Sequence, residues 1–345
     1  MRPITTSLDA RLPHAYVPKG MNNYRNCTLC PRECRVDRCC GPSGFCGQSA
    51  DLRLAWAGLH FGEEPSISGE KGSGTIFFPG CTLKCSFCQN YQLSHHGFGR
   101  PISIGELARI MVRLQREGAE NINLVSGSHF THSIVEAIGQ AKKEGLSLPI
   151  VWNSSGYESI DTLEMLFEQV DIFLPDLKTL DQELSEELFK CGDYPEVAAE
   201  ALKEIATRKE ERRVGGKLKQ GMIVRHLVLP GHLESSLQVL SWFKEALYDK
   251  CLLSLMFQYT PVSPLKPMGS LNRRVNRAEY EAVLGYLERL NIERGFIQEL
   301  EAEQDVLPGF EKGNPFPLAL AKPLWLGVAD AVADAAADGS SDRRI

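Results

Sequence analysis

Hydrophobic and polar positions alternate along the chain with two different periods. Apolar positions spaced three and four residues apart predict seven amphipathic helices, over residues 104–117, 132–143, 159–169, 181–190, 196–209, 237–247 and 277–290. Short apolar runs, rich in β-branched and aromatic residues, predict six buried strands over residues 75–78, 121–126, 149–152, 170–174, 222–229 and 252–258. Six strand–helix repeats predict an α/β protein with a parallel sheet and right-handed crossovers, either a barrel or an open doubly wound sheet.

The segments outside this alternation divide the chain of 345 residues further. We expect an extended arm over residues 1–25, a Cys-rich module with a connector over 26–70, and a core over 71–300. A C-terminal extension over 301–345 is Ala- and Asp-rich, which predicts disorder at its end and one amphipathic helix over 324–337.

Composition narrows the setting of the protein. Apolar residues make up 43% of the chain, which is enough for a sizeable core, and the net charge of −6 argues against nucleic-acid binding. We expect no signal peptide and no membrane span. Nine of the eleven cysteines lie in two clusters at metal-binding spacings and are not spread as a disulfide framework, which predicts a reducing cytoplasm.

The sharpest motif is Cys81-x3-Cys85-x2-Cys88, directly after the first predicted strand and its closing Pro-Gly. Three thiolates on one loop can hold three irons of a cubane cluster and leave the fourth iron open for a chelating ligand. Zinc usually takes four ligands from paired arms, and buried free thiols need no fixed spacing. The motif therefore favours a [4Fe-4S] cluster, with zinc and free thiols as the alternatives.

A second group of cysteines, Cys27, Cys30, Cys34 and Cys46, precedes the core. Four thiolates can close a coordination shell, as a structural zinc or an auxiliary iron–sulfur cluster requires. Spacing does not choose between these metals, and Cys39 or Cys40 could replace one of the four ligands. The alternative is a thiol-rich tail without metal.

Polar residues follow the predicted strands, at the edge where β/α barrels carry their chemistry. They are Ser126 to His129, Asn153 to Gly156, Asp176, Lys178, Arg225, His226, Gln258 and Tyr259. Asp176 and Lys178 share a face, whereas the adjacent Arg225 and His226 face opposite ways on a regular strand. The run Glu63-Glu64-Pro65 lies before the cluster motif, and we expect it in a connecting loop.

The three-cysteine motif, with Phe87 before its last cysteine, resembles the signature of the radical S-adenosylmethionine (SAM) superfamily. The resemblance implies a partial (β/α)6 TIM-type barrel and a [4Fe-4S] cluster whose open iron binds SAM. It also implies reductive cleavage of SAM to a 5′-deoxyadenosyl radical that abstracts hydrogen, with an electron donor such as flavodoxin or ferredoxin.

Four further segments look like the pyruvate formate-lyase activating enzyme group, over about residues 27–299. They are Cys30-Pro31-Arg32-Glu33-Cys34, Trp152 to Tyr157, Leu174 to Lys178 and Arg225 to Gly231. The resemblance implies that Asp176 and Lys178 contact SAM, with Ser126, Asn153, Ser155 and His226 as further cofactor-binding residues. Two positions depart from that group: Ser126 to His129 replace its Gly-Gly-Glu-Pro motif, and Asn153 replaces an acidic cation ligand.

Three functional hypotheses follow. The first is an activase that installs a glycyl radical on a protein partner, and the second is a radical SAM enzyme that modifies a peptide or small metabolite. The third is a non-enzymatic iron–sulfur or zinc protein. A six-stranded barrel should also leave a wide lateral mouth lined by residues 259–267, which favours a macromolecular substrate.

Overall fold

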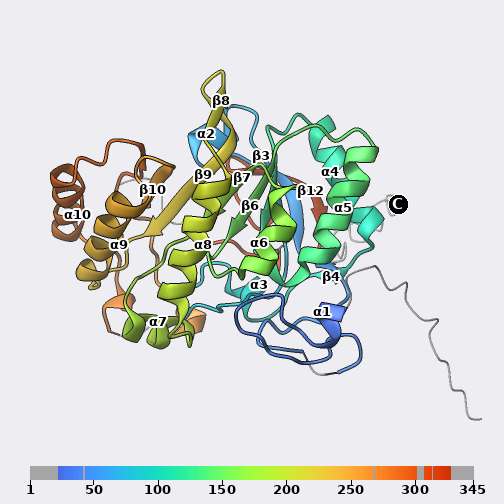
Figure 1. Ribbon diagram of the computed structural model, residues 1–345, viewed down its shortest axis with the longest axis horizontal. Helices are drawn as coiled ribbons and strands as arrows, with labels where there is room; N and C mark the ends of the chain where they lie inside the picture. Colours follow the sequence, from blue (N-terminus) through green and yellow to red (C-terminus); the bar gives the residue numbers. More distant parts are fainter. Residues whose placement is uncertain (1–21, 42, 267–268, 301–306, 313, 328–345) are drawn as a thin grey trace, which may run out of the picture.

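The computed structural model describes residues 22–41, 43–266, 269–300, 307–312 and 314–327. Its main sheet runs in the order β11-β10-β9-β7-β6-β5-β3-β2-β12 (Figure 1). The parallel strands are β3 (Ser73–Phe77), β5 (Ile122–Val125), β6 (Ile150–Ser154), β7 (Ile172–Pro175), β9 (Lys217–Leu227), β10 (Leu252–Met256) and β11 (Gly295–Ile297). All six predicted strands are present, and β11 is an additional short parallel strand.

Each parallel strand is added beside the previous one, so the strand order never reverses. Right-handed crossovers then place all the connecting helices on one face, which is the arrangement of a barrel and not of a doubly wound sheet. These helices are α4 (Ile104–Arg116), α5 (Thr131–Lys143), α6 (Ile160–Phe167), α7 (Gln182–Phe189), α8 (Tyr194–Arg208), α9 (Leu233–Ala246) and α10 (Arg277–Arg289). The fold is therefore the partial β/α barrel that the resemblance implied.

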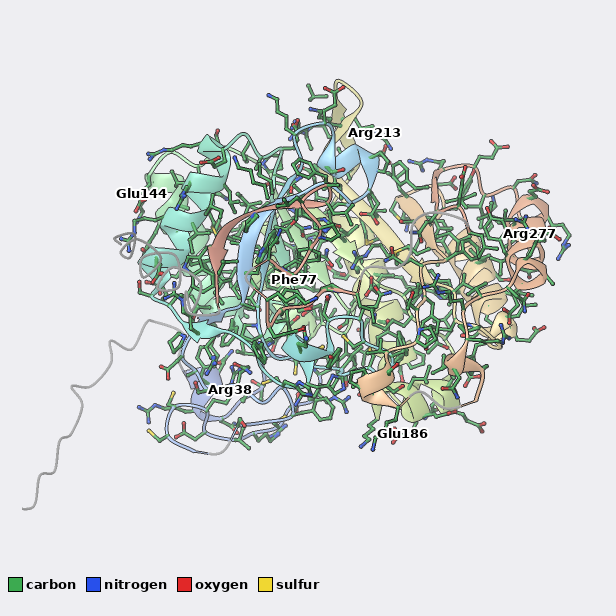
Figure 2. The ribbon with its side chains drawn as sticks, turned by 180° about the vertical axis from the view of Figure 1, so that it is seen from behind. Arg38, Phe77, Glu144, Glu186, Arg213 and Arg277 are labelled. Carbon is green, nitrogen blue, oxygen red and sulfur yellow. The ribbon has the colours of Figure 1, made fainter. Side chains whose placement is uncertain are left out.

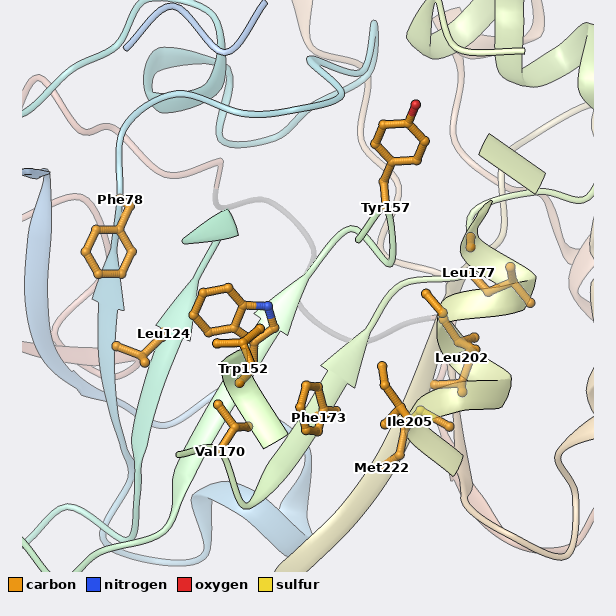
Figure 3. Close-up of a cluster of buried hydrophobic side chains, with 14 of the residues drawn as sticks. Phe78, Leu124, Trp152, Tyr157, Val170, Phe173, Leu177, Leu202, Ile205 and Met222 are labelled. Atoms are coloured by element: carbon orange, nitrogen blue, oxygen red, sulfur yellow. The ribbon is translucent and has the colours of Figure 1, made fainter. Parts of the chain in front are cut away.

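The largest core lies between the sheet and these helices (Figure 3). Leu124, Trp152 and Phe173 sit side by side in register on β5, β6 and β7, and each is at most 1% exposed. Leu202 and Ile205 of α8 pack against the same cluster. Because side chains alternate along a strand, the neighbouring residues face the inside of the barrel, where the site is built.

Residues 51–73 form more regular structure than the connector that the sequence predicted, although Glu63 and Glu64 do lie in a loop. They contain β1 (Arg53–Leu54), β2 (Trp56–His60) and α2 (Pro65–Ser68), while β1 pairs with β4 (Arg100–Pro101). Strand β2 pairs antiparallel with β3, and β12 (Ala321–Leu326) pairs antiparallel with β2. The apolar run from Trp56 to Leu59 is buried on both faces, so burial rather than alternation defines this strand.

Strand β12 also corrects the predicted helix over residues 324–337, because residues 324–326 are extended. The rest of that helix, the C-terminal disorder and the arm over residues 1–21 lie outside the described residues. The end of the predicted arm is helical, as α1 (Asn22–Arg25). The antiparallel strand β8 (Arg212–Val214) forms a hairpin with β9.

Strands β11 and β12 form opposite edges of the main sheet, and the described residues 307–312 and 314–320 lie between them in the sequence. Among these residues, Phe310 is 3% exposed and packs with Phe316 against Phe77 of β3 and Trp56 of β2. These aromatic rings cover the inner face at that edge. The wide lateral mouth lined by residues 259–267 stays a prediction.

Candidate functional site

The loop after β3 carries the three cysteines of the first motif and leads into α3 (Tyr91–Ser94). Hydrogen-bond donors point at two of the sulfurs: the Leu83 N–H lies 3.3 Å from Cys81 Sγ, and the Ser94 hydroxyl lies 3.2 Å from Cys88 Sγ. Burial, and then the neighbouring Cys81, raise the pKa of the Cys88 thiol to about 11. Three mutually interacting thiols with donors at their sulfurs fit a thiolate-bound cluster.

Lys178 links this loop to the ends of the strands. Burial raises the pKa of the Cys85 thiol, and the positive charge of Lys178 acts against that shift. The next cysteine in the sequence, Cys191, donates its thiol proton to Asp193 at 3.1 Å. Within the described residues, the first motif therefore remains a set of three cysteines, which fits a cubane with one open iron.

Asp176 and Arg225 form the centre of a polar network inside the barrel. Asp176 Oδ2 accepts from Lys178 Nζ at 2.6 Å, and Asp176 Oδ1 accepts from Arg225 Nε at 2.8 Å. Arg225 Nη2 also donates to Asn153 Oδ1 at 2.6 Å. Residues predicted from three different strand ends thus meet in one place, because parallel strands end at a common edge.

The network is balanced by charge. Burial opposes ionisation of Asp176, but Arg225 and Lys178 outweigh it and hold the pKa of that carboxyl below its ordinary value. Burial likewise disfavours the Lys178 cation, and Asp176 outweighs it, so the pKa of Lys178 is raised. Both side chains are charged at neutral pH and less than one fifth exposed. A buried cation in this position can bind the carboxylate of an amino-acid ligand.

Glu63 approaches the same network from the opposite end of the barrel. Its Oε1 accepts from Asn123 at 3.0 Å, and its Oε2 lies 3.9 Å from Arg225 Nη1. Burial raises the pKa of Glu63, although Arg225 acts against that shift. The position of the run at 63–65 before the cluster motif predicts a loop that packs the N-terminal module against the barrel. Its two adjacent acids before α2 enter the barrel instead, and only the fold reveals that approach.

His226, Ser126 and Ser155, which were predicted to bind the cofactor, differ in burial and in the direction they face. His226 is 1% exposed, and its ring nitrogens lie 2.7 Å from the Leu177 carbonyl and 3.0 Å from Ser236 Oγ. Both nitrogens are thus engaged by the protein on the helix side, while the adjacent Arg225 faces the barrel. Ser126 lies half-buried at the end of β5 with a positive φ of 59°, and Ser155 is half-buried after β6.

The N-terminal module lies at the same end of the molecule as the cluster loop. Figure 2 shows its Arg38 at the end opposite Arg213 of the β8–β9 hairpin. Burial raises the pKa of the Cys30 thiol, a hydrogen bond from the Arg32 main chain acts against that shift, and Cys46, Cys27 and Cys34 make smaller contributions to it. Cys40 is exposed. In the described part of the chain, no three His, Cys, Asp or Glu side chains are arranged to hold a single metal ion.

Arg32 of the Cys-Pro-Arg-x-Cys segment fixes the module to the core. Its guanidinium donates to the carbonyls of Thr82 at 3.0 Å and Phe189 at 2.8 Å, and also to the carbonyl of Lys190. Thr82 lies within the cluster loop itself. The ring of Phe45 lies 3.9 Å from the Arg32 guanidinium, and Lys84 of the cluster loop lies 5.7 Å from the same ring. The module therefore packs directly on the first motif.

Among the residues that the structure describes, no helix is both long and apolar enough to cross a membrane.

Comparisons with known proteins agree with this geometry. A family model described as the Radical SAM superfamily matches residues 75–241. An uncharacterized protein of Methanocaldococcus jannaschii is 31% identical over 281 residues, and the match covers 79% of this chain and 77% of that protein.

Solved structures are similar over part of the fold. Streptococcus suis SuiB bound to its precursor peptide SuiA has 16% identity and a TM-score of 0.45, over 64% of this chain and 46% of that chain. The chain thus spans about half the length of SuiB. Methylornithine synthase has 17% identity and a TM-score of 0.45, over 68% of this chain and 73% of that chain.

Proposed function

The chain belongs to the radical SAM superfamily, and on that premise we propose that it cleaves SAM at the Cys81, Cys85 and Cys88 loop and abstracts hydrogen from a substrate. A bound [4Fe-4S] cluster supplies one electron, which breaks a C–S bond of SAM to give methionine and an adenosyl radical that takes hydrogen from the substrate. One observation carries the proposal: Lys178 pairs with Asp176 at 2.6 Å at the strand ends, and its positive charge acts on the thiol of Cys85.

The residues of this chain have separate roles in the proposal. The three thiolates hold the cluster. Leu83 donates a hydrogen bond to the sulfur of Cys81, and Ser94 donates one to the sulfur of Cys88. Lys178 binds the carboxylate of SAM, and Asp176 orients Lys178. Arg225 holds Asp176 and Asn153 in place. The electron comes from a donor protein such as flavodoxin or ferredoxin.

The test is anaerobic reconstitution with iron and sulfide, followed by SAM and dithionite, with 5′-deoxyadenosine measured by mass spectrometry. We expect the parent to form 5′-deoxyadenosine and each of Cys81→Ala, Cys85→Ala and Cys88→Ala to form none, because two thiolates do not retain the cubane. Cys251→Ala is the control, since this buried cysteine lies at the start of β10. Full activity in any one of the three motif variants contradicts the proposal.

We also propose a second metal in the N-terminal module, held by Cys27, Cys30, Cys34 and Cys46. Two observations support an iron–sulfur cluster or zinc. The thiols of Cys27, Cys34 and Cys46 all affect the pKa of the Cys30 thiol, and the Phe45 N–H lies 3.3 Å from Cys34 Sγ. The variant Cys30→Ala/Cys34→Ala should lose one metal centre and keep the first cluster. An unchanged metal content in that variant contradicts the second site.

For the substrate, the activating-enzyme likeness supports a glycyl radical on a partner protein. A specific observation favours the second candidate, a peptide or small metabolite: the rings of Phe310 and Phe316 pack on Phe77 at the inner face beside β3 and take up space there. Turnover with deuterium-labelled candidates separates the two, because the label appears in 5′-deoxyadenosine only when it comes from the true substrate. Transfer from a metabolite and from no protein excludes the activase role. A protein without SAM cleavage under strong reduction would be a non-enzymatic metal carrier.

A further inference from the structure

Arg38, a buried arginine of the N-terminal module, has no carboxylate partner among the residues that the structure describes. The Arg38 side chain is 1% exposed, although arginine is almost never fully buried unless it is paired. Its three nitrogens donate to main-chain carbonyls: Nε to Gln48 at 3.0 Å, Nη2 to Ser49 at 2.7 Å and Nη1 to His129 at 2.8 Å. These bonds fix the guanidinium plane but leave its charge unbalanced.

The other groups around Arg38 do not supply a negative charge. The Tyr24 ring lies 4.8 Å from the guanidinium carbon, and burial raises the pKa of this phenol, so it is neutral. The Phe130 ring lies on the same guanidinium at 5.8 Å. Burial lowers the pKa of His129 to about 3, so its imidazole is neutral as well. Over the described ranges of the chain, no Asp or Glu lies within ion-pair distance of Arg38.

Only the cysteines of the module remain to balance this charge. Arg38 Nη1 lies 3.7 Å from Cys27 Sγ. The positive charge of Arg38 also acts on the Cys46 thiol, against the burial that raises the pKa of that thiol. Cys39 lies in the same electrostatic neighbourhood, further towards the surface. A buried, unpaired cation is strongly unfavourable, whereas a cation beside metal-bound thiolates is compensated.

We propose that Arg38 is the fixed positive charge that balances a negatively charged metal–thiolate centre formed by Cys27, Cys30, Cys34 and Cys46. The inference rests on the second metal site proposed above and adds the residue that controls its affinity. Zinc and an iron–sulfur cluster bound by four thiolates are both anionic, so the same argument applies to either metal. Free thiols would leave Arg38 uncompensated.

Arg38 also connects this centre to the first cluster loop. The His129 that accepts from Arg38 has its Nε2 at 2.7 Å from the carbonyl of Pro79, two residues before Cys81. Gly80, between them, faces the module so closely that a Cβ there would lie 2.9 Å from the Cys46 carbonyl oxygen. The two cysteine groups are therefore neighbours through main-chain contacts, and the charge of Arg38 lies between their loops.

The experiment compares metal retention in the full-length protein, loaded anaerobically with iron and sulfide or with zinc. Arg38→Met removes the charge, Arg38→Lys keeps it, and Arg35→Met is the matched control because that side chain is 66% exposed. Each protein is challenged with graded EDTA, and bound metal is counted by mass spectrometry. The double variant Cys30→Ala/Cys34→Ala defines the signal that belongs to the module.

We expect Arg38→Met to lose the metal of the module at roughly 10- to 100-fold lower EDTA concentration than the parent, as for other residues that support a metal ligand. Arg38→Lys should retain the metal better than Arg38→Met, and Arg35→Met should behave like the parent. If the centre is an iron–sulfur cluster, its reduction potential should become more negative in Arg38→Met, because a nearby positive charge favours the reduced state.

Equal retention in Arg38→Met and the parent overturns the proposal, and equal loss in the Met and Lys variants assigns the effect to hydrogen bonding instead of charge. Where Arg38→Met does not fold, Arg38→Lys decides, since retained metal supports the charge argument and complete loss overturns it. A parent with no more metal than the double cysteine variant would refute the second site itself, while 5′-deoxyadenosine formation reports separately on the first.

Discussion

Replacing Lys178 by Met tests whether the polar network at the strand ends binds SAM. In the structure the ammonium group of Lys178 has one carboxylate partner, Asp176 at 2.6 Å, and both side chains are less than one fifth exposed. Asp176 keeps its second partner, Arg225 at 2.8 Å, when Lys178 is removed. The variant therefore leaves no unpaired buried carboxylate, and the fold and the cysteine loop should be maintained.

The expected loss is in ligand binding. A charge-assisted hydrogen bond removed from a largely dry site costs about 1.5–3 kcal/mol. Each 1.4 kcal/mol corresponds to a factor of about ten in affinity, so the dissociation constant for SAM should rise by roughly ten- to a hundredfold. Iron and sulfide content should be unchanged, because Lys178 does not hold the cluster.

The assay is isothermal titration of SAM into the anaerobically reconstituted protein, with iron and sulfide measured on the same sample. Lys143→Met at the exposed end of α5 is the control, and it should bind SAM like the parent. A dissociation constant within about twofold of the parent refutes the role of Lys178. A parallel loss of iron would instead place Lys178 in support of the cluster loop.

Three further predictions concern stability. Arg225→Met should lower the free energy of unfolding in urea by about 3–5 kcal/mol, because Asp176 loses one of its two cations and the buried Glu63 loses its neighbouring positive charge, and a loss below about 1 kcal/mol contradicts the network. Burial lowers the pKa of His226 to about 4, so its folded form binds fewer protons than the unfolded form. Stability from this residue is present above about pH 6.5 and is lost as the pH falls towards 4. His226→Gln should flatten that part of the melting-temperature profile, and an unchanged slope contradicts it. Phe310→Ala should cost about 3–5 kcal/mol, because the ring is buried between Phe77 and Phe316, and a melting temperature equal to that of the parent contradicts its packing.

Local patterns were sufficient for the repeating part of the fold and for the first motif. The period of each segment depends on neighbours within a few residues. For this reason the six predicted strands and the seven predicted helices are all present in the core. The loop of Cys81, Cys85 and Cys88 is equally local, because three ligands within eight residues need no distant contact. The position of Asp176 and Lys178 after a strand could be predicted, because the end of that strand is visible in the sequence.

Tertiary structure decided what depends on segments far apart in the chain. Strand β2 is defined by its burial between neighbouring strands. Strand β12, at residues 321–326, is defined by its pairing with β2. Glu63 approaches Arg225 to 3.9 Å from the far end of the barrel. Its position before the cluster motif in the sequence predicts only a connecting loop. His226 faces the helices because β9 is a regular strand whose Arg225 takes the inner position. Nothing in the sequence around Arg38 indicates its burial. The side chain becomes buried, without a carboxylate partner among the described residues, only when the module packs on the barrel.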